Sequence, residues 1–573
     1  MSASPSPAIW FDRITFSDGT EISLDLGDVV VLVGPNNAGK SAALQDLRTL
    51  NGNRLYSGRV IRSVGFRQQG SLDDVINFLV EIGSLRVQGD HFFCVPGRTP
   101  YTRARLSGEW DSMDDRHQPA FRSVFCQHLG ADGRIGLANP VPPVDTLAQP
   151  AAHPIHMVFT DDDLGSRLSA SFRRAFGEEL VLDRGRGNSL PFVVGQVPQR
   201  MPDEDRTSTS YVARLRAVCA DLDKNGDGMR AFASVILHLL APSAPSVLLL
   251  DEPEAFLHPP QARLLGELIA RERRPDSQLF VATHSADVLE GLLSAAPKNL
   301  RIIRLERAGD VNRARKLDSV ETARIAADPL LRFSSVLSGL FHRRVILCES
   351  DADCLFYKTL LHTHAVSGDQ HPDVHFVHGG GKARLPALAR VLRNLGVRVD
   401  VIADMDALDR VEFVQSLVEA VSGDWAAVCS DLKAFRNAIE NNAPPTPADV
   451  KARLRSVLEG DFQGPNGVSE LKKSVDDILR SVSPWSRLKI SGRMGISRGR
   501  PMEQFNSIDA AFRRWGLWIV PVGELEGFCR TVGGKGPRWV QTVLEKYDPE
   551  TSLELEGARE FLRVLWHGPD EGA

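Results

Sequence analysis

The sequence predicts a mixed α/β protein with two α/β domains, and three observations favour this class. A continuous apolar run at residues 29–33, typical of a buried parallel strand, leads into a glycine-rich loop. Apolar strands return at residues 246–250 and 278–282 with a helical stretch between them, which makes a strand–helix–strand unit. A second series of strands follows at residues 344–348, 374–377 and 397–403.

Length and composition fit two ordinary globular domains. A chain of 573 residues exceeds what one hydrophobic core usually supports, and 42% hydrophobic with 25% charged residues excludes a disordered or fibrous protein. The longest apolar run, 235–250, is interrupted by prolines and is shorter than the roughly 20 residues of a membrane span. With no secretory signal at the N-terminus, we expect a cytoplasmic protein without membrane contacts. Because the net charge is −5, nucleic-acid binding would need a local basic surface.

We place the first domain at residues 1–335 and the second at residues 336–573. The pattern at 51–206 is irregular and has proline-rich connectors, which indicates an insertion in the first domain and a candidate dimerisation region. A polar helical stretch and then a basic one indicate a second insertion at 411–500.

Residues 34–41, GPNNAGKS, fit the phosphate-binding pattern GxxxxGK[ST] between a buried strand and a helix. In such a loop, backbone N–H groups surround the phosphates and the helix N-terminus favours their charge. Lys40 would reach the β- and γ-phosphates of ATP, and Ser41 would bind Mg²⁺. The residues expected to bind nucleotide here are Gly34, Asn36, Asn37, Gly39, Lys40 and Ser41.

Two carboxylates end the apolar strand at 246–250. Asp251 is expected to hold the Mg²⁺ shell, and Glu252 to polarise the water that attacks the γ-phosphate. His284 follows the next strand, where it can sense the γ-phosphate. These motifs in this order predict an ATPase.

The order of the motifs resembles ABC-type ATPases of the SMC and OLD (overcoming lysogenization defect) kind over about residues 8–330. The resemblance implies a signature loop that completes the ATP site of a partner chain. Residues 225–230, NGDGMR, are the candidate, with Asn225 and Gly228 at the nucleotide. Asn225 stands where serine is usual, a departure from the common LSGGQ form. A shared ATP site implies a homodimer or a higher even oligomer.

Acidic residues mark the strand ends of the second domain. Glu349 ends the strand at 344–348, Asp353 lies on the helix that follows, and Asp404 and Asp406 end the strand at 397–403. Carboxylates at adjacent strand ends converge at one edge of a parallel sheet. Four hard oxygen donors there suit Mg²⁺ or Mn²⁺.

A strand-end glutamate followed later by DxD resembles the TOPRIM domain over about residues 343–410. The resemblance implies that Glu349 serves a metal or acid–base role, that Asp404 and Asp406 hold metal, and that Asp353 matches a further acidic position of OLD-type proteins. Ser350 stands where glycine is usual, which bears on the backbone geometry at this turn. The run at 378–382, HGGGK, is similar to the glycine–lysine turn of TOPRIM domains or is a flexible turn.

OLD-type nucleases use a second metal held by later carboxylates, with a lysine near the scissile phosphate. The resemblance therefore implies Glu526, or else Glu524, as a metal ligand and Lys535 as the catalytic lysine. The alternative for Lys535 is a solvated surface residue without a catalytic role. Two metals would activate water and stabilise the leaving oxygen, while the lysine offsets charge on phosphorus.

Residues 484–501 contain five basic residues and no acidic one. Such a segment beside a nuclease site would attract the phosphate backbone of DNA without reading its sequence, or it is a solvated loop. The basic residues are Arg487, Lys489, Arg493, Arg498 and Arg500.

The leading hypothesis is an ATP-regulated, divalent-metal-dependent DNA endonuclease or nickase. Resemblance to OLD, Gabija-type and retron-associated nucleases implies antiphage defence, in which a helicase or a reverse transcriptase with its non-coding RNA would be the partner. The alternative is an ATP-driven DNA-binding sensor with an inactive TOPRIM scaffold. A topoisomerase or primase is disfavoured, because none of the five tyrosines lies in a recognisable cleavage domain.

Overall fold

The computed structural model divides the chain into two compact units, Met1–Phe341 and His342–Ala573. It describes residues 6–568 except 53–55, 82–84, 89–90, 95–99, 112–124, 146–152, 203, 242–244, 296–298, 318–321, 324, 326, 328–335, 370, 442–445, 461, 463–466 and 481–482. Residue 335, at the boundary expected from the sequence, lies outside the described residues. Within the described part, no helix is long and apolar enough to cross a bilayer.

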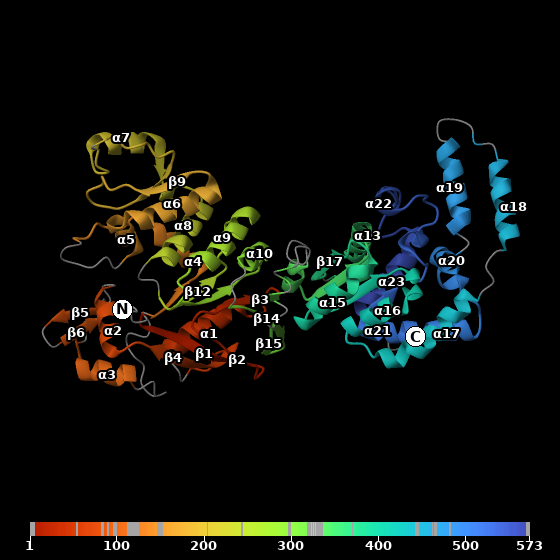
Figure 1. The fold of residues 1–573 in the computed structure, drawn as a ribbon, viewed down its shortest axis with the longest axis horizontal. Coiled ribbons are helices and arrows are strands. Elements are labelled where there is room, and N and C mark those ends of the chain that lie inside the picture. Colours follow the sequence, from red (N-terminus) through yellow and green to blue (C-terminus); the bar gives the residue numbers. More distant parts are fainter. Residues whose placement is uncertain are drawn as a thin grey trace. The chain divides into compact units, whose positions relative to one another are not determined.

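The first unit is built on a six-stranded sheet with the order β15-β14-β3-β13-β12-β8 (Figure 1). Only β15 runs antiparallel to its neighbour. All residues of β3 and β13 are buried, as expected for central parallel strands covered on both faces. The strands are β3 (Val29–Val33), β8 (Cys126–Leu129), β12 (Val247–Asp251), β13 (Gln278–Ala282), β14 (Leu300–Ala308) and β15 (Val311–Lys316).

One face of this sheet is covered by α1 (Lys40–Gly52) and a smaller antiparallel sheet. The smaller sheet has the order β2-β1-β4, formed by β1 (Ala8–Phe16), β2 (Glu21–Ser23) and β4 (Ile61–Gln69). Apolar side chains of β1, α1 and the large sheet form one core, which includes Phe11, Leu44 and Phe280. This core fixes the start of α1, where the phosphate-binding loop ends.

Helices of the first unit include α8 (Asp227–Leu240), α9 (Pro259–Glu272) and α10 (Ala286–Ser294). Phe172 and Phe176, on α6 (Asp162–Phe176), contact Phe232 of α8 with ring centroids 6.3 and 5.4 Å apart. The remaining elements are α2 (Leu72–Glu81), β5 (Leu85–Gln88), β6 (His91–Cys94), β7 (Pro100–Thr102), α3 (Arg103–Asp111), α4 (Ala131–Arg134), α5 (Pro154–Thr160), β9 (Glu179–Leu182), β10 (Phe192–Gly195), α7 (Thr209–Val218) and β11 (Cys219–Asp221).

The insertion expected at 51–206 is not separate from the nucleotide-binding fold. Within it, β4 pairs with β1 from the N-terminus, and β8 pairs in parallel with β12 at the edge of the main sheet. The pairing escaped sequence reasoning because β8 has only four residues, too few for a periodic signal.

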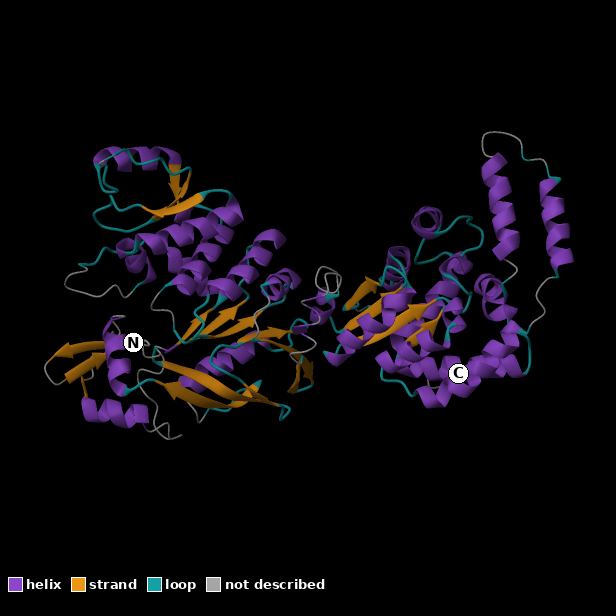
Figure 2. Cartoon of the chain, viewed as in Figure 1, coloured by secondary structure: helices purple, strands orange, loops and turns teal. Residues whose placement is uncertain are grey.

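The second unit contains a parallel sheet with the order β17-β16-β18-β19, flanked by helices (Figure 2). Ile346, Ile402 and Trp518 of this sheet share a core with α13, α22 and α23, while α15 contacts β16 and β18. The mixed α/β class expected from the sequence is confirmed in both units. The elements are β16 (Arg344–Cys348), β17 (Val374–His378), β18 (Arg398–Ala403), β19 (Leu517–Ile519), α13 (Asp351–Leu361), α14 (His364–Ser367), α15 (Leu385–Asn394), α22 (Gly536–Lys546) and α23 (Glu556–His567).

The chain between β18 and β19 is helical. Helices α18 and α19 lie side by side (Figure 1), and α20 carries the first part of the basic segment. The helices are α16 (Val411–Ala420), α17 (Trp425–Glu440), α18 (Pro447–Leu458), α19 (Gly467–Arg480), α20 (Pro484–Ser491) and α21 (Arg500–Trp515).

Candidate metal centre and ATP site

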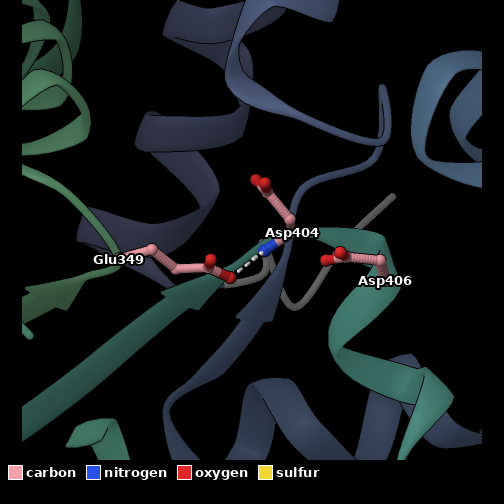
Figure 3. A group of neighbouring side chains, drawn as sticks. All are labelled: Glu349, Asp404 and Asp406. Carbon is pink, nitrogen blue, oxygen red and sulfur yellow. Dashed lines mark hydrogen bonds between the residues drawn. The ribbon is translucent and has the colours of Figure 1, made fainter. Parts of the chain in front are cut away.

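Three carboxylates meet at the carboxyl edge of the second unit's sheet. One oxygen from each of Glu349, Asp404 and Asp406 can be chosen so that all lie within 4.8 Å of one another. Figure 3 shows Glu349 reaching in from one side and Asp406 from the other, with Asp404 between them. The Asp404 backbone N–H donates to Glu349 Oε1 at 3.2 Å. The cluster arises because β16 and β18 are adjacent parallel strands and so end at the same edge.

The turn after β16 is built around a serine cap. Ser350 has extended backbone angles, φ −130° and ψ 167°, and its side chain accepts from the Asp353 N–H. Asp353 Oδ2 accepts in return from the Ser350 N–H at 2.8 Å and from its hydroxyl at 3.0 Å, which completes a capping box. Serine is therefore accommodated without backbone strain where the TOPRIM pattern has glycine.

Burial and nearby negative charge raise the pKa of Glu349 and of Asp404 in this cluster. Burial raises the pKa of Glu349, and nearby Asp406 raises it further. Burial, together with the charge of Glu349, raises the pKa of Asp404 to about 8. Burial also raises the pKa of Asp353. A concentration of carboxylates that resist ionisation is a site where a cation would be strongly stabilised.

Two lysines already contact the carboxylates. Lys489 Nζ, on α20, lies 2.7 Å from Asp404 Oδ2 and 3.5 Å from Asp406 Oδ2. Lys382 Nζ lies 3.2 Å from Asp406 Oδ2. Burial lowers the pKa of Lys489, but Asp404 and Asp406 raise it by more, so the net shift is upward. Sequence reasoning assigned Lys489 to a DNA-binding stretch and missed this contact, for which no spacing rule gives a signal.

A second group of residues faces the cluster across a cavity of about 810 Å³. Glu524 is bound by Lys535, with Nζ 2.6 and 2.5 Å from its two carboxylate oxygens. Glu526 Oε1 accepts from the Gly536 N–H at 2.8 Å. The lining includes Glu349, Asp353, Asp404, Lys489, Glu524, Glu526 and Lys535. The structure thus brings every carboxylate and lysine predicted for this site to one cavity except Asp406, which belongs to the cluster but not to the lining.

Gly523 positions this second group. Its carbonyl accepts from the Met405 N–H at 2.8 Å, which joins the loop of Glu524 to the loop of Asp404. Its φ is +101°, and a Cβ atom there would lie 2.0 Å from the Lys489 carbonyl oxygen. Only glycine allows this approach of α20 to the loop.

The donor set fits a divalent cation. Carboxylate oxygens are the ligands that Mg²⁺ and Mn²⁺ prefer, and the three of the cluster are close enough to share one ion. Asp353 lines the same cavity but is not one of the three carboxylates within 4.8 Å of one another, and its Oδ2 accepts from Ser350. We therefore expect Asp353 and Glu526 to contribute only to a second ion, as ligands or through water.

Lys489 and a cation would compete for Asp404. We expect Lys489→Met to lower the dissociation constant for Mg²⁺ by at least about tenfold, because two unit charges about 4 Å apart interact by about 4 kcal/mol near a protein surface and solvent screening leaves only part of this. Isothermal titration calorimetry checks the value. Lys472→Met, at an exposed position of α19, is the matched control. Unchanged or weaker binding by Lys489→Met would contradict the competition.

Cation binding should depend on pH through Asp404. Below about pH 8 this carboxyl holds a proton that the cation must displace, since the pKa of Asp404 is raised to about 8. The affinity for Mg²⁺ is expected to rise roughly tenfold per pH unit up to about 8 and then level off. Titrations at pH 6, 7, 8 and 9 measure the slope. Asp404→Asn should flatten it, and a wild-type affinity independent of pH would refute the assignment.

In the first unit, the phosphate-binding loop lies between β3 and α1. Asn37 has φ +63°, a conformation that asparagine tolerates, and Gly34 has φ +144° where a Cβ would lie 2.2 Å from the Leu305 carbonyl oxygen. Lys40 Nζ donates to the carbonyls of Gly34 at 2.8 Å and Pro35 at 3.1 Å. The lysine is therefore held at the mouth of the loop that Asn36 and Gly39 complete.

The strand-end carboxylates lie beside this loop. Ser41 Oγ donates to Asp251 Oδ1 at 2.9 Å, so the two predicted Mg²⁺ ligands are in contact. Burial lowers the pKa of Lys40, while the charges of Glu252 and Glu254 oppose this shift. The charges needed to bind a nucleotide–Mg²⁺ complex therefore gather at one end of β12.

Glu252 occupies a constrained turn. Its φ is +46°, unusual for a residue other than glycine, and its N–H donates to the Ala282 carbonyl at 2.8 Å. His284 Nδ1 lies 3.4 Å from Glu252 Oε1 and 3.4 Å from Glu254 Oε1. Glu254 Oε1 also accepts from the His284 N–H at 3.0 Å and from Thr283 Oγ1 at 2.7 Å. Glu254, absent from the predicted site, thus positions His284.

Arg134 is a second residue that the sequence did not reveal. Its guanidinium is fully buried and donates to the carbonyls of Asp251 and Glu252, each at 2.9 Å. These two hydrogen bonds hold the backbone at the end of β12 and in the turn that follows. No motif links it to the strand, because α4 lies far away in the sequence.

The candidate signature loop stands at the start of α8. Asn225 Nδ2 donates to the Asp221 carbonyl at 2.8 Å, which shapes the turn before the helix. Gly228 lies against the segment after β12, where a Cβ would come within 2.5 Å of the Phe256 carbonyl oxygen. A role of Asn225 and Gly228 toward nucleotide bound by a partner chain stays a prediction.

Comparison with known families agrees with this architecture. Residues 340–406 match the model "Overcoming lysogenization defect protein-like, TOPRIM domain". Residues 211–290 match the model "AAA domain, putative AbiEii toxin, Type IV TA system". The fold and site define a P-loop ATPase joined to a TOPRIM domain.

Among curated proteins, the chain is similar to the Old nuclease of Escherichia phage P2, with 24% identity over 174 residues. The match covers 29% of this chain and 28% of the relative's length. Together with the two domain matches, it supports a chain that joins an ATPase domain to an OLD-like TOPRIM domain.

Solved structures with some similarity include SMC head domains. A head bound to the C-terminal winged-helix domain of ScpA has 12% identity and a TM-score of 0.34, covering 55% of this chain and 100% of that one. The SMC head of Thermotoga maritima has 13% identity and a TM-score of 0.29, with 55% and 100% covered.

Proposed function

We propose that this protein is an ATP-regulated, divalent-metal-dependent DNA endonuclease or nickase. One observation carries the proposal: the Glu349, Asp404 and Asp406 carboxylates lie within reach of one cation, at the edge of a cavity that also holds Glu526 and Lys535. Metal-assisted phosphoryl transfer requires carboxylates that hold the metal ions in a cavity that a phosphodiester can enter. A lysine in the same cavity can stabilise the phosphate. The Old nuclease relative supports the same chemistry.

Each residue of the proposed nuclease site has a separate role. Glu349, Asp404 and Asp406 would hold the first Mg²⁺ or Mn²⁺, and Asp353 and Glu526, which line the same cavity, would contribute to a second. Ions bound there would supply an activated water and stabilise the leaving oxygen. Lys535, now paired with Glu524, would offset charge that develops on the scissile phosphate. Ser350 and Gly523 hold the carboxylate loops in place.

The first unit would couple ATP to this cut. Lys40 and Ser41 bind the phosphates and Mg²⁺, Asp251 completes the ion's shell, and Glu252 activates the attacking water. We propose that Asn225 and Gly228 complete the site of a second copy, so that the active form is a homodimer or a higher even oligomer. Such a dimer would form and open with the ATP cycle.

Incubation of the purified protein with supercoiled plasmid tests the proposal. Nicked or linear product should form with Mg²⁺ or Mn²⁺ and disappear with EDTA, and adding ATP or a non-hydrolysable analogue should change the rate. An intact plasmid in every metal and nucleotide condition would rule out the nuclease.

A second candidate is an ATP-driven sensor that binds DNA without cutting it. Lys489 and Lys382 favour it, because they already neutralise Asp404 and Asp406 in the way that a scaffold would need. The sensor would hydrolyse ATP and bind DNA in a mobility-shift assay, yet cut under no condition. Metal binding that is strengthened by Lys489→Met supports the nuclease over the sensor.

We further propose a role in antiphage defence within the cytoplasm, where both ATP and invading DNA are found. The similarity to the OLD-like TOPRIM model and to the Old nuclease supports this role. A helicase, or a reverse transcriptase with its RNA, would be the partner. Plaque counts on cells carrying the wild-type gene, compared with cells carrying the Glu349→Gln gene, test it; equal counts would contradict it.

A further inference from the structure

An exposed apolar tip follows α20, the helix whose last turn lines the metal-site cavity. Met494 has 90% of its surface exposed, in a short 3₁₀ turn, Gly492–Gly495, that directly follows α20. Ile490, at the end of the same helix, is 54% exposed and lines the cavity next to Lys489. Of the two, Ile490 lines the metal-site cavity and Met494 follows it in the next turn, so both are close enough to this cavity to meet a ligand that enters it.

The backbone beside the tip contacts the loop that carries Glu524. The Arg493 N–H donates to the Pro521 carbonyl at 2.8 Å, and Ile496 on the other side of Met494 is buried. Gly492 has φ +61°, and a Cβ there would come within 2.5 Å of the Pro521 carbonyl oxygen. Met494 is thus fixed by its neighbours to the loop that carries Glu524.

The surroundings of the tip are basic. Residues 484–501 contain no acidic residue, and Arg493, Arg498 and Arg500 are exposed. Arg530, also exposed, donates to the Ile490 carbonyl at 3.1 Å. Guanidinium groups can bind the phosphates of DNA, and an apolar side chain can insert between its stacked bases. The combination of the two around this tip therefore fits DNA as the partner.

Ile490 also lines a second cavity. It measures about 410 Å³ and is lined mainly by apolar groups, with Ile439, Leu488 and Ile490 among them and Arg487 at its polar side. This volume falls in the range of small-molecule sites, about 300–1,000 Å³. Ile490 thus lines both the metal-site cavity and a second space that is large enough for one displaced base.

We propose that Met494 and Ile490 form a wedge that unstacks a base step of the bound DNA, and that the second cavity receives the displaced base. The preferred substrate is then DNA whose bases are already unstacked near the scissile phosphate, such as a bulge. Apolar wedges of methionine or isoleucine that kink DNA in this way are a known mode of binding. The inference rests on the proposed nuclease function and names its substrate class.

Cleavage of two duplexes tests the wedge, one fully paired and one with a single-base bulge at the same place. For Met494→Ala we expect the rate on the paired duplex to fall at least about tenfold, because the variant lacks the side chain that opens the base step. The rate on the bulged duplex should stay within about twofold of wild type, since its step is already open. Leu553→Ala, which removes another apolar side chain that is 87% exposed, should leave both rates unchanged.

A binding assay provides a readout independent of cutting. Duplex DNA with 2-aminopurine at the wedge step should brighten when bound by the full-length Glu349→Gln protein and stay dim with Glu349→Gln combined with Met494→Ala. The wedge proposal is contradicted if Met494→Ala lowers the cleavage rate equally on both duplexes. It is also contradicted if the 2-aminopurine fluorescence is the same with both proteins. If the wild type cuts neither duplex, the nuclease proposal fails, and the fluorescence alone decides whether the wedge exists.

Discussion

Glu349→Gln is expected to reduce DNA cleavage by more than about 100-fold while ATP hydrolysis stays within about twofold of wild type. Loss of a partner that merely orients a metal ligand already costs 10–100-fold, and this change neutralises a carboxylate of the cluster itself. Glutamine keeps the size of the side chain and can still accept from the Asp404 N–H, so the fold should persist. Initial rates on supercoiled plasmid in Mn²⁺ measure the effect.

Asp351→Asn is the matched control for this change. Asp351 lies two residues along the chain, is exposed, and lines no part of the cavity, so its variant should cut like wild type. Calorimetry on Glu349→Gln should also show weaker Mg²⁺ binding. If Glu349→Gln cuts at the wild-type rate, the three carboxylates do not form the cutting site, and the sensor becomes the better hypothesis.

Glu252→Gln is expected to lower the rate of ATP hydrolysis by roughly 10²–10⁴-fold, the usual contribution of a positioned general base. ATP should still bind, because Lys40, Ser41 and Asp251 are unchanged. The variant would therefore collect in the ATP-bound state, which should increase the dimer fraction if the signature loop of one copy closes on the other. Phosphate release and analytical ultracentrifugation with ATP measure the two effects.

The control for the second change is Glu272→Gln. Glu272 is the last residue of α9 and forms a surface ion pair with Arg167, 2.8 Å apart, which contributes little to stability. Hydrolysis by this variant should match wild type. A Glu252→Gln protein that hydrolyses ATP normally would show that another group activates the water. His284, whose Nδ1 lies 3.4 Å from Glu252 Oε1, is then the candidate.

Comparing plasmid cleavage by Glu252→Gln with that by wild type then shows how ATP controls the cut. Faster cleavage by a protein held in the ATP state means that ATP permits cutting, and slower cleavage means that ATP restrains it. The two units are joined in one chain but have separate cores, so the coupling between them must be measured.

Much of the candidate site could be predicted because its motifs are local. A phosphate-binding loop needs a strand, glycines and a helix in immediate succession, so Lys40 and Ser41 are recognisable in the sequence. Asp251 and Glu252 follow an apolar strand in the same way. Glu349, Asp404 and Asp406 end strands of one parallel sheet, and such ends share an edge whatever connects them.

Contacts between distant segments could not be predicted. Lys489 reaches Asp404 from a helix inserted between β18 and β19, and Arg134 reaches the carbonyls of Asp251 and Glu252 from a helix of four residues. Neither residue has a periodic pattern or a fixed spacing to its partner. The assignment of 51–206 as an insertion was incomplete for the same reason, since pairing of β4 and β8 depends on long-range contacts.

By itself, the sequence determined the α/β class, the ATP-binding motifs and the strand ends that bear carboxylates, because each follows from chemistry within a short stretch of chain. Only the tertiary structure decided which charges oppose those carboxylates, which loops fix them, and where an apolar tip stands beside them. The reason is physical: a lysine is placed near an aspartate far away in the sequence by the packing of whole helices, and that packing is a property of the entire core.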